Sequence, residues 1–293
     1  MKTLYFDCFS GISGDMTIGA LLDLGLDLDY LKTELKKLPV EGYELKASRV
    51  TRSNLSAMKF DVVMEGQHDH HHHHHHHHEQ SQSHFHRRAS EILAMIRDSP
   101  LNANTKRMAA DIFTKLAISE GKVHHIAPED VEFHEVGAVD SIVDTIGAAI
   151  GFDALGIERF LCSAINIGSG FIHCQHGVFP VPAPATADLL RHATIYQKHA
   201  QTELVTPTGA AILAAVVNQF GAMDGFSVER TMLDREVVEV DTEYGKVKIK
   251  VSKMNGEVVN FAPEYEDCVR IAREKHVPLK RVQALAINAY LNM

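Results

Sequence analysis

A run of nine consecutive histidines at residues 70–78, far from both ends of the 293-residue chain, restricts the fold more than any other feature. The run has no apolar periodicity and nothing to bury, so no helix or strand of a core can contain it. We therefore expect a disordered, flexible loop over residues 67–86. The ordered elements must form on either side of this loop.

Histidine in such numbers also indicates metal binding. Neutral imidazole is a common ligand of nickel, zinc and copper. A run this long offers many overlapping, exchangeable sites, which suits capture and transfer of a metal better than catalysis. An inert linker and an expression tag are the alternatives, although tags lie at chain ends. The metal-binding interpretation assigns ten ligands: His68, His70, His71, His72, His73, His74, His75, His76, His77 and His78.

Composition narrows the class of protein. A hydrophobic fraction of 45% and a charged fraction of 23% are typical of globular domains. The net charge of -9 argues against nucleic acid or an anionic membrane as a partner. The sequence shows no signal peptide and no apolar run long enough to span a bilayer. The scattered cysteines form no CxxC pair, which favours a reducing cytoplasm: Cys8, Cys162, Cys174 and Cys268.

Strand-like and helix-like segments follow one another and predict a mixed α+β fold. We expect a larger N-terminal α/β domain over residues 1–225 and a small C-terminal α+β module over residues 226–293. The expected strands of the first domain include residues 4–9, 58–64, 131–136 and 159–167, and its helices include residues 16–24, 102–120, 140–155 and 210–220. Gly121 is expected to end the helix over residues 102–120.

Two segments are candidates for binding a phosphate. Residues 10–15, Ser-Gly-Ile-Ser-Gly-Asp, join the first strand to a helix, and backbone N–H groups at a helix start can hold a phosphate. The spacing is neither that of a P-loop nor GxGxxG. Residues 206–209, Thr-Pro-Thr-Gly, open another helix, where the hydroxyls contact a phosphate or simply cap the helix. The candidate residues are Ser10, Gly11, Ser13, Gly14, Thr206 and Thr208.

Four carboxylates are candidates for holding a divalent metal. Asp7 and Asp15 flank the turn that follows the first strand. Asp140 and Asp144 are four residues apart and share one face of a helix, where they repel each other unless something positive offsets them. The alternative is structural: Asp15 and Asp140 cap their helices, Asp7 ends a strand and Asp144 is solvated surface.

Histidine and cysteine supply two further candidate groups. Glu132 and His134 share one face of an expected strand, and Glu135 points to the other face. His173, Cys174 and His176 lie within four residues. Thiolate with imidazole suits nickel, zinc or copper, and this group is a candidate transfer site with open coordination positions. The alternative is a buried cysteine beside two histidines in a turn.

Five segments together resemble the nickel-insertion proteins (LarC type) that complete the nickel-pincer nucleotide cofactor of lactate racemase. The first is Tyr-Phe-Asp-Cys-Phe-Ser-Gly-Ile-Ser-Gly-Asp-Met at residues 5–16. The second is the histidine run. The others are Phe-His-Glu-Val-Gly-Ala-Val-Asp-Ser-Ile-Val-Asp at residues 133–144, Phe-Pro-Val-Pro-Ala-Pro-Ala at 179–185 and Thr-Pro-Thr-Gly-Ala-Ala at 206–211. The resemblance covers nearly all of residues 1–220 in order.

The resemblance implies a nickel insertase or chelatase, a lyase that uses CTP with Mg(II) or Mn(II). Such proteins load Ni(II) into pyridinium-3,5-bisthiocarboxylic acid mononucleotide by forming one carbon–nickel and two sulfur–nickel bonds. The implied partners are this pincer nucleotide precursor and lactate racemase or another pincer-dependent enzyme, and a homo-oligomer is a further expectation. Metal–carbon bond formation removes a ring proton, so a general base must lie beside the metal. The candidate bases are Glu132, His134 and Glu135.

The chain departs from the family at one place. Family members carry a long stretch, with an acidic Asn-Ile-Asp-Asp-Met motif, between segments like residues 206–220 and 228–251. That stretch belongs to the C-terminal domain associated with CTP and metal binding, so residues 226–293 are expected to form a shortened version of this domain. The join falls near residues 221–227. One alternative is therefore a non-catalytic nickel storage or delivery protein. A second alternative is a metal-dependent phosphohydrolase that uses Asp7, Asp15, Asp140 and Asp144.

Overall fold

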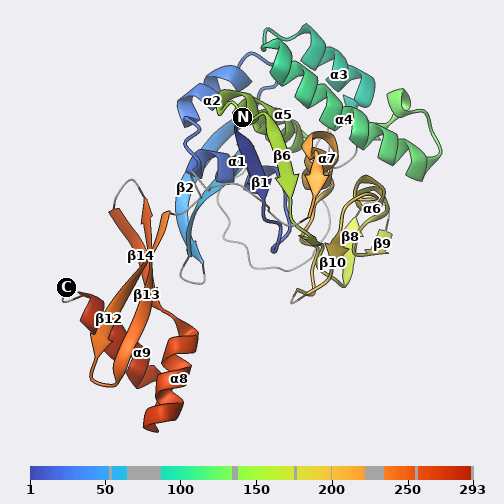
Figure 1. Cartoon of the computed structure of the whole chain (residues 1–293). Helices are drawn as coiled ribbons and strands as arrows, with labels where there is room; N and C mark the ends of the chain where they lie inside the picture. The colour runs from blue at the N-terminus through green and yellow to red at the C-terminus, as the bar shows by residue number, and fades with distance from the viewer. Residues whose placement is uncertain are drawn as a thin grey trace. The chain divides into compact units, whose positions relative to one another are not determined.

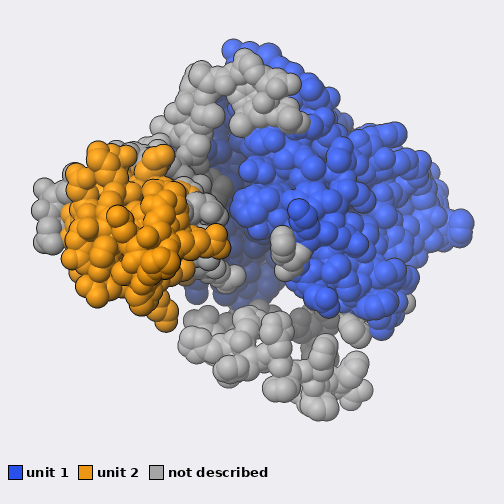
Figure 2. All heavy atoms as spheres, turned by 60° about the horizontal axis from the view of Figure 1, so that its bottom comes forward, with its two compact units in different colours: residues 1–48, 59–226 blue, residues 49–58, 227–293 orange. Residues whose placement is uncertain are grey.

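The structure, a computed structural model, describes residues 1–52, 55–64, 87–133, 138–174, 177–198, 200–221, 234–254 and 257–291. The chain forms two compact units, residues 1–48 with 59–226 and residues 49–58 with 227–293, which are coloured separately in Figure 2. Both units combine helices with small sheets, so the prediction of a mixed α+β fold is confirmed. The loop expected at residues 67–86 lies outside the described residues.

A three-stranded parallel sheet lies at the centre of the larger unit, in the order β1 (Thr3–Phe6), β6 (Arg159–Cys162) and β11 (Gln219–Phe220). Figure 1 shows β1 and β6 side by side, and their register pairs Phe6 with Cys162. Because the strands are parallel, their carboxyl ends meet at one edge of the sheet. The turn after β1 starts from this edge and leads into the first helix.

Helices supply most of the core of this unit. They are α1 (Gly14–Asp23), α2 (Leu28–Leu35), α3 (Ala89–Asp98), α4 (Ala103–His124), α5 (Val139–Ala154), α6 (Pro184–Leu189) and α7 (Pro207–Val216), with a short 3-10 turn, η1 (Pro128–Asp130). On α4 the buried residues Met108, Ile112 and Leu116 recur every four residues, which makes one apolar face. The helix α5 is buried along most of its length and packs Phe152 edge-on against Phe160, with ring centroids 5.0 Å apart.

Two glycines of α5 allow α1 to approach closely. A methyl group on Gly147 would lie 2.8 Å from Ile18 Cδ1, and one on Gly151 would lie 2.8 Å from Leu21 Cδ1. Both distances are shorter than a van der Waals contact, so a larger residue would displace these side chains. The two glycines are four residues apart and therefore face the same side of α5.

Eight other strands of the described residues pair in two-stranded sheets. They are β2 (Tyr43–Arg52) with β3 (Leu55–Met64), β4 (Arg87–Arg88) with β5 (Glu132–Phe133), β7 (Ile165–Asn166) with β10 (Ile195–Tyr196), and β8 (Phe171–Cys174) with β9 (Gly177–Pro180).

The smaller unit has its own core. Its antiparallel sheet contains β12 (Asp234–Thr242), β13 (Gly245–Met254) and β14 (Glu257–Pro263), followed by α8 (Tyr265–Lys275) and α9 (Leu279–Leu291). The buried side chains of β13 alternate along the strand, as Val247, Ile249 and Val251. They pack with buried residues of α8 and α9, including Ile271 and Val282.

Three expected element boundaries were wrong. The helix α4 continues through Gly121 to His124 and ends at His125, whose φ of 54° is left-handed. Gly121 instead makes room for the returning chain, because a methyl group there would lie 2.9 Å from the Ile126 carbonyl oxygen. The expected strand over residues 159–167 is two strands, β6 and β7, which belong to different sheets.

The helix expected over residues 210–220 ends early. The helix α7 stops at Val216, and the chain then extends into β11. Asn218 holds this turn, because its side-chain oxygen accepts from Phe160 N at 3.0 Å and its own N–H donates to Phe160 O at 2.9 Å. Pairing with the central sheet therefore outweighs helix propensity at this point.

Asp188, on α6, links this helix to α4 through its carboxylate. We expect Asp188→Asn to lower the free energy of unfolding by about 1 kcal/mol at pH 7. Its carboxylate accepts from Lys122 Nζ at 2.9 Å and from Ser119 Oγ at 3.2 Å, and pairs with Arg191. The hydrogen bond from Lys122 is the main reason that the pKa of Asp188 lies below its ordinary value. A lowered folded pKa gives stability that is present above the unfolded pKa and disappears as the pH falls through the folded pKa.

Urea unfolding at pH 7 and pH 3 measures this effect. Asp111→Asn is the matched control, since Asp111 forms an exposed ion pair at 3.7 Å with Arg107 and its loss should change stability by less than about 0.5 kcal/mol. A loss for Asp188→Asn that is the same at both pH values would contradict the assignment.

Candidate functional site

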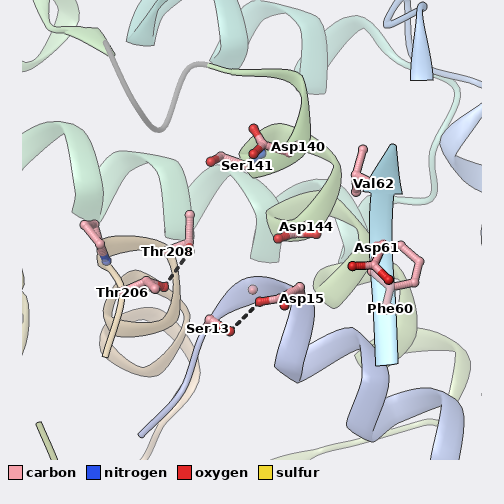
Figure 3. A pocket seen from close by; sticks show the side chains of 12 residues that line it. Ser13, Asp15, Phe60, Asp61, Val62, Asp140, Ser141, Asp144, Thr206 and Thr208 are labelled. Carbon is pink, nitrogen blue, oxygen red and sulfur yellow. Dashed lines mark hydrogen bonds between the residues drawn. The ribbon is translucent and has the colours of Figure 1, made fainter. Parts of the chain in front are cut away.

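The amino-terminal ends of α1, α5 and α7 meet beside strand β3 around a cavity of about 330 Å³ (Figure 3). The start of each helix leaves backbone N–H groups without helical partners and carries the positive end of the helix dipole. The cavity thus combines donors for an anion with several carboxylates. It is lined by Ser13, Gly14, Asp15, Phe60, Asp61, Val62, Asp140, Ser141, Asp144, Thr206, Pro207 and Thr208.

Ser13 and Gly14 bring the start of α1 into the cavity. Ser13 is the N-cap, and its hydroxyl accepts from Met16 N at 3.4 Å and donates to the Asp15 carboxylate. A methyl group on Gly14 would lie 2.7 Å from Asp144 Cβ and 2.9 Å from its Oδ2. Only glycine therefore lets the start of α1 lie directly against Asp144.

The start of α7 is fixed by Thr206 and Gly209. Thr206 is the N-cap and accepts from Gly209 N at 3.2 Å, so its hydroxyl performs the capping role that the sequence left open. The hydroxyls of Thr206 and Thr208 are 2.9 Å apart. A methyl group on Gly209 would lie 2.3 Å from Ile12 O, and Thr206 N donates to the same oxygen at 3.1 Å. The starts of α7 and α1 are therefore packed backbone against backbone.

Asp144 has the most unusual electrostatic environment in the cavity. Its Oδ1 atom is buried and accepts no hydrogen bond within the described part of the chain. Burial, followed by the negative charges of Asp15 and Asp140, raises the pKa of Asp144 to about 8. A hydrogen bond from the Asp15 backbone opposes this shift. At neutral pH the carboxyl therefore holds a proton, which a bound cation would displace.

Seven of the residues singled out in the sequence meet at this cavity, although their positions span almost 200 residues of the chain. Figure 3 shows Asp140 and Asp144 on successive turns of α5, with Asp15 facing Asp144 from the start of α1. The full set is Ser13, Gly14, Asp15, Asp140, Asp144, Thr206 and Thr208.

Other predicted residues lie elsewhere. Asp7 and Ser10 are exposed and do not line the cavity. Gly11 has a φ of +79° and packs against the backbone of Leu204, so its role is conformational. Glu132 is exposed on β5, where Arg88 Nε donates to its Oε1 at 3.3 Å.

Several predicted ligands and two predicted bases lie outside the described residues. These are the ten histidines of residues 68–78 together with His134, Glu135 and His176. His173 and Cys174 lie on β8, but the structure describes only their backbone. Within the described ranges, no three His, Cys, Asp or Glu side chains are grouped so that they could hold a metal ion. The helices of those ranges are all too short or too polar to cross a membrane.

Two further polar residues line the cavity that were not predicted from the sequence, Asp61 and Ser141. Asp61 lies on β3 and contributes to the raised pKa of Asp144, and Lys59 Nζ donates to its Oδ1 at 2.5 Å. A single carboxylate in the apolar stretch Phe60–Met64 was the available signal. Ser141 follows Asp140 directly, and its N–H donates to the Asp140 carboxylate at 2.8 Å.

The chain matches the family model described as nickel insertion protein over residues 4–230 and 225–283, and it belongs to that family. This confirms the resemblance found in the sequence. The two matched segments overlap at residues 225–230, and this overlap includes the end of the expected join at residues 221–227.

Individual relatives agree with this membership. A protein of Geobacillus kaustophilus, named pyridinium-3,5-bisthiocarboxylic acid mononucleotide nickel insertion protein, is 45% identical over 232 residues, which are 78% of this chain and 54% of that protein. A putative nickel insertion protein of Syntrophobacter fumaroxidans is 47% identical over 231 residues, 79% of this chain and 55% of that protein. The chain spans about half the length of these two relatives.

A third relative aligns along nearly its whole length. The pyridinium-3,5-bisthiocarboxylic acid mononucleotide nickel insertion protein of Thermotoga petrophila is 35% identical over 389 residues, 96% of each chain. Because this alignment is longer than the 293 residues present here, an internal part of that relative has no counterpart. A solved structure titled LarC2, the C-terminal domain of a cyclometallase, is 34% identical over 21% of this chain and 42% of its own. Its TM-score of 0.20 establishes no shared fold.

Proposed function

We propose that this chain inserts nickel into pyridinium-3,5-bisthiocarboxylic acid mononucleotide, the reaction named for its relatives from Geobacillus and Thermotoga. The observation that supports this proposal best is the meeting of three helix starts and four carboxylates at one cavity. A mononucleotide carries a phosphate, which suits helix starts with free N–H groups and hydroxyls. Nickel is a cation, which suits the carboxylates.

Hydroxyls and carboxylates both line the cavity. Ser13, Thr206 and Thr208 place hydroxyls at the starts of α1 and α7 and are the proposed phosphate contacts. Asp144 is the proposed contact for the nickel that is being transferred, and the charges of Asp15 and Asp140 attract the cation to it. Because the described side chains do not form a complete ligand group, the sulfur atoms of the nucleotide would supply further contacts. Asp144 gives up its proton when the cation binds, so nickel binding at this site should tighten as the pH rises towards 8.

The remaining steps of the proposal come from family membership. Removal of the ring proton needs a base, and Glu132, His134 and Glu135 precede α5, which carries Asp140 and Asp144. Asp7, with His173, Cys174 and His176, is proposed as a transfer point between the histidine run and the cavity. CTP with Mg(II) or Mn(II) would drive this lyase reaction. The protein would act in the cytoplasm as a homo-oligomer. Lactate racemase or another pincer-dependent enzyme would receive the product.

Activation of lactate racemase tests the proposal. The purified chain is mixed with nickel, CTP, Mg(II) and the sulfur-bearing nucleotide, and racemase activity is then measured. The protein from Thermotoga petrophila is assayed in parallel, because it contains the internal part that is missing here. Activation by both supports insertion by this chain, whereas activation by the relative alone rules it out.

Nickel storage or delivery without insertion is the second candidate function, and the histidine run favours it. We expect that replacing residues 68–78 with a Gly/Ser segment of equal length removes about three to five bound nickel ions per chain, at two to three imidazoles for each ion. Insertion at saturating nickel should continue, because the run supplies metal without performing chemistry. Metal content by mass spectrometry and the racemase assay provide the two measurements.

Each outcome separates the two functions. Loss of insertion at saturating nickel would show that the run belongs to the chemical site. Nickel binding by the intact chain without insertion under any condition would favour storage. Equal length in the replacement segment keeps a change in chain length from affecting the result.

A further inference from the structure

Two buried thiols touch each other at the carboxyl edge of the central sheet. The sulfur atoms of Cys8 and Cys162 are 3.7 Å apart, and the two residues are only 2% and 0% exposed. Cys162 is the last residue of β6, and Cys8 follows the end of the neighbouring strand β1. Neither residue lines the cavity, and the proposed function uses neither.

The backbone around the two thiols holds them in this contact. Cys8 N donates to Ser163 Oγ at 2.9 Å, and Ser163 N donates to Phe6 O at 2.9 Å. A disulfide has a sulfur–sulfur distance of about 2.05 Å, so the two sulfur atoms must approach by about 1.6 Å. Rotation of the Cys162 side chain at the end of β6 and of the Cys8 side chain just beyond β1 can supply a movement of this size.

The two sulfur atoms have different roles. The Cys162 thiol donates to the Cys8 sulfur, and this hydrogen bond together with burial raises the pKa of Cys162. Cys162 is the donor in this contact and is fully buried, whereas Cys8 is 2% exposed, so Cys8 is the sulfur that meets an oxidant first. Cys162 is then placed to react with the oxidised Cys8.

We infer that Cys8 and Cys162 form a dithiol that a peroxide converts into a disulfide. The Cys8 sulfur attacks one peroxide oxygen, the O–O bond breaks, and a sulfenic acid and one water form. The Cys162 sulfur then displaces the hydroxyl of the sulfenic acid, which leaves as a second water. Two thiols lose two electrons and two protons, and hydrogen peroxide gains them.

The position of Cys8 links this reaction to the turn before α1. The Cys8 carbonyl oxygen accepts from Gly11 N at 3.1 Å and from Asn166 N at 3.0 Å. The same turn leads directly to Ser13 and Asp15 at the cavity. The dithiol is therefore a modification site at the base of the turn that starts α1.

Peroxide treatment of the full chain tests the inference. Cys174→Ser is used as the background so that the fourth cysteine cannot take part. The native protein is exposed to hydrogen peroxide, alkylated in denaturant and digested, and its peptides are weighed. We expect the peptides of Cys8 and Cys162 to be joined, and dithiothreitol to separate them.

Cys268 is the internal control, since it is also fully buried and packs in the core of the smaller unit. The free thiols of Cys8 and Cys162 should disappear at least about tenfold faster than that of Cys268. Equal rates, or oxidation of Cys8 to sulfinic acid without a joined peptide, would overturn the inference. This comparison uses no variant of the pair and so does not depend on how such variants fold.

Two single variants test the order of the steps. In Cys162→Ser, Cys8 should stop at the sulfenic acid and react with dimedone, while in Cys8→Ser, Cys162 should remain a free thiol. The reverse pattern would contradict the assigned order. Circular dichroism checks that each variant is folded, and alanine replaces serine where it is not.

Discussion

Replacing Asp144 with asparagine is expected to make the folded chain more stable, by about 1–3 kcal/mol at pH 8. The pKa of this carboxyl is about 8 in the folded state, because burial and the charges of Asp15 and Asp140 disfavour ionisation. In the unfolded chain it returns to an ordinary value near 3.9. Asparagine has a similar shape and carries no charge, so it avoids this cost.

The sign of the pH dependence follows from the raised pKa. The folded chain holds an extra proton between about pH 4 and pH 8, so the contribution of Asp144 to stability is largest below pH 4 and declines up to pH 8. The advantage of the asparagine variant should therefore grow from pH 5 to pH 8. Urea unfolding at both values measures it, and Asp111→Asn, at an exposed position outside the cavity, should change stability by less than about 0.5 kcal/mol. An advantage that is equal at both pH values would contradict this assignment.

The same variant is expected to lose activity. If the cavity holds nickel as proposed, Asp144→Asn removes a ligand oxygen and should reduce nickel-dependent racemase activation at least about 10-fold. Greater stability with lower activity is the pattern expected of a site whose charges repel until a ligand binds. Full activity in this variant would exclude Asp144 as a ligand, while the stability measurement would remain valid on its own.

Gly11→Ala is expected to cause the largest loss of stability, about 3–5 kcal/mol. Gly11 has a φ of +79°, and a methyl group there would lie 1.8 Å from Leu204 O, a backbone atom that cannot rotate away. Ile12 N donates to this same oxygen at 2.9 Å, so the start of α1 and the Leu204 segment would be forced apart. The cavity should lose its shape as well.

Gly42→Ala is the matched control for this change. Gly42 has almost the same φ, +81°, but nothing lies within 4 Å of a methyl group at that position. Gly42→Ala should therefore lower the free energy of unfolding only by the cost of placing alanine in a left-handed backbone conformation, about 1 kcal/mol. Urea unfolding compares the two variants, with soluble yield as the measure if Gly11→Ala does not fold. Equal losses would show that the contact with Leu204 is unimportant.

Local patterns predicted much of the fold. The glycine turn after β1, the carboxylates four residues apart on α5 and the Thr-Pro-Thr-Gly start of α7 were all visible in the sequence. Their meeting was not visible, because periodicity shows which face of an element is buried and does not show which elements pack together. Asp61 was missed for this reason, since nothing in β3 indicates that it borders α1 and α5. Asp7 shows the opposite case, in which a carboxylate close to Asp15 in sequence is exposed and does not line the cavity.

The two glycines of α5 have a consequence for how this protein can change over evolution. Gly147 and Gly151 set how closely α1 approaches α5, and those helices carry Asp15 and Asp144. Adding a single methyl group at either glycine would shift the spacing between these carboxylates without altering any polar residue. Ions of different radius prefer different oxygen spacings. If the cavity holds nickel as proposed, its preference among metals can therefore drift through apolar substitutions in the interior, which a comparison restricted to charged residues would overlook.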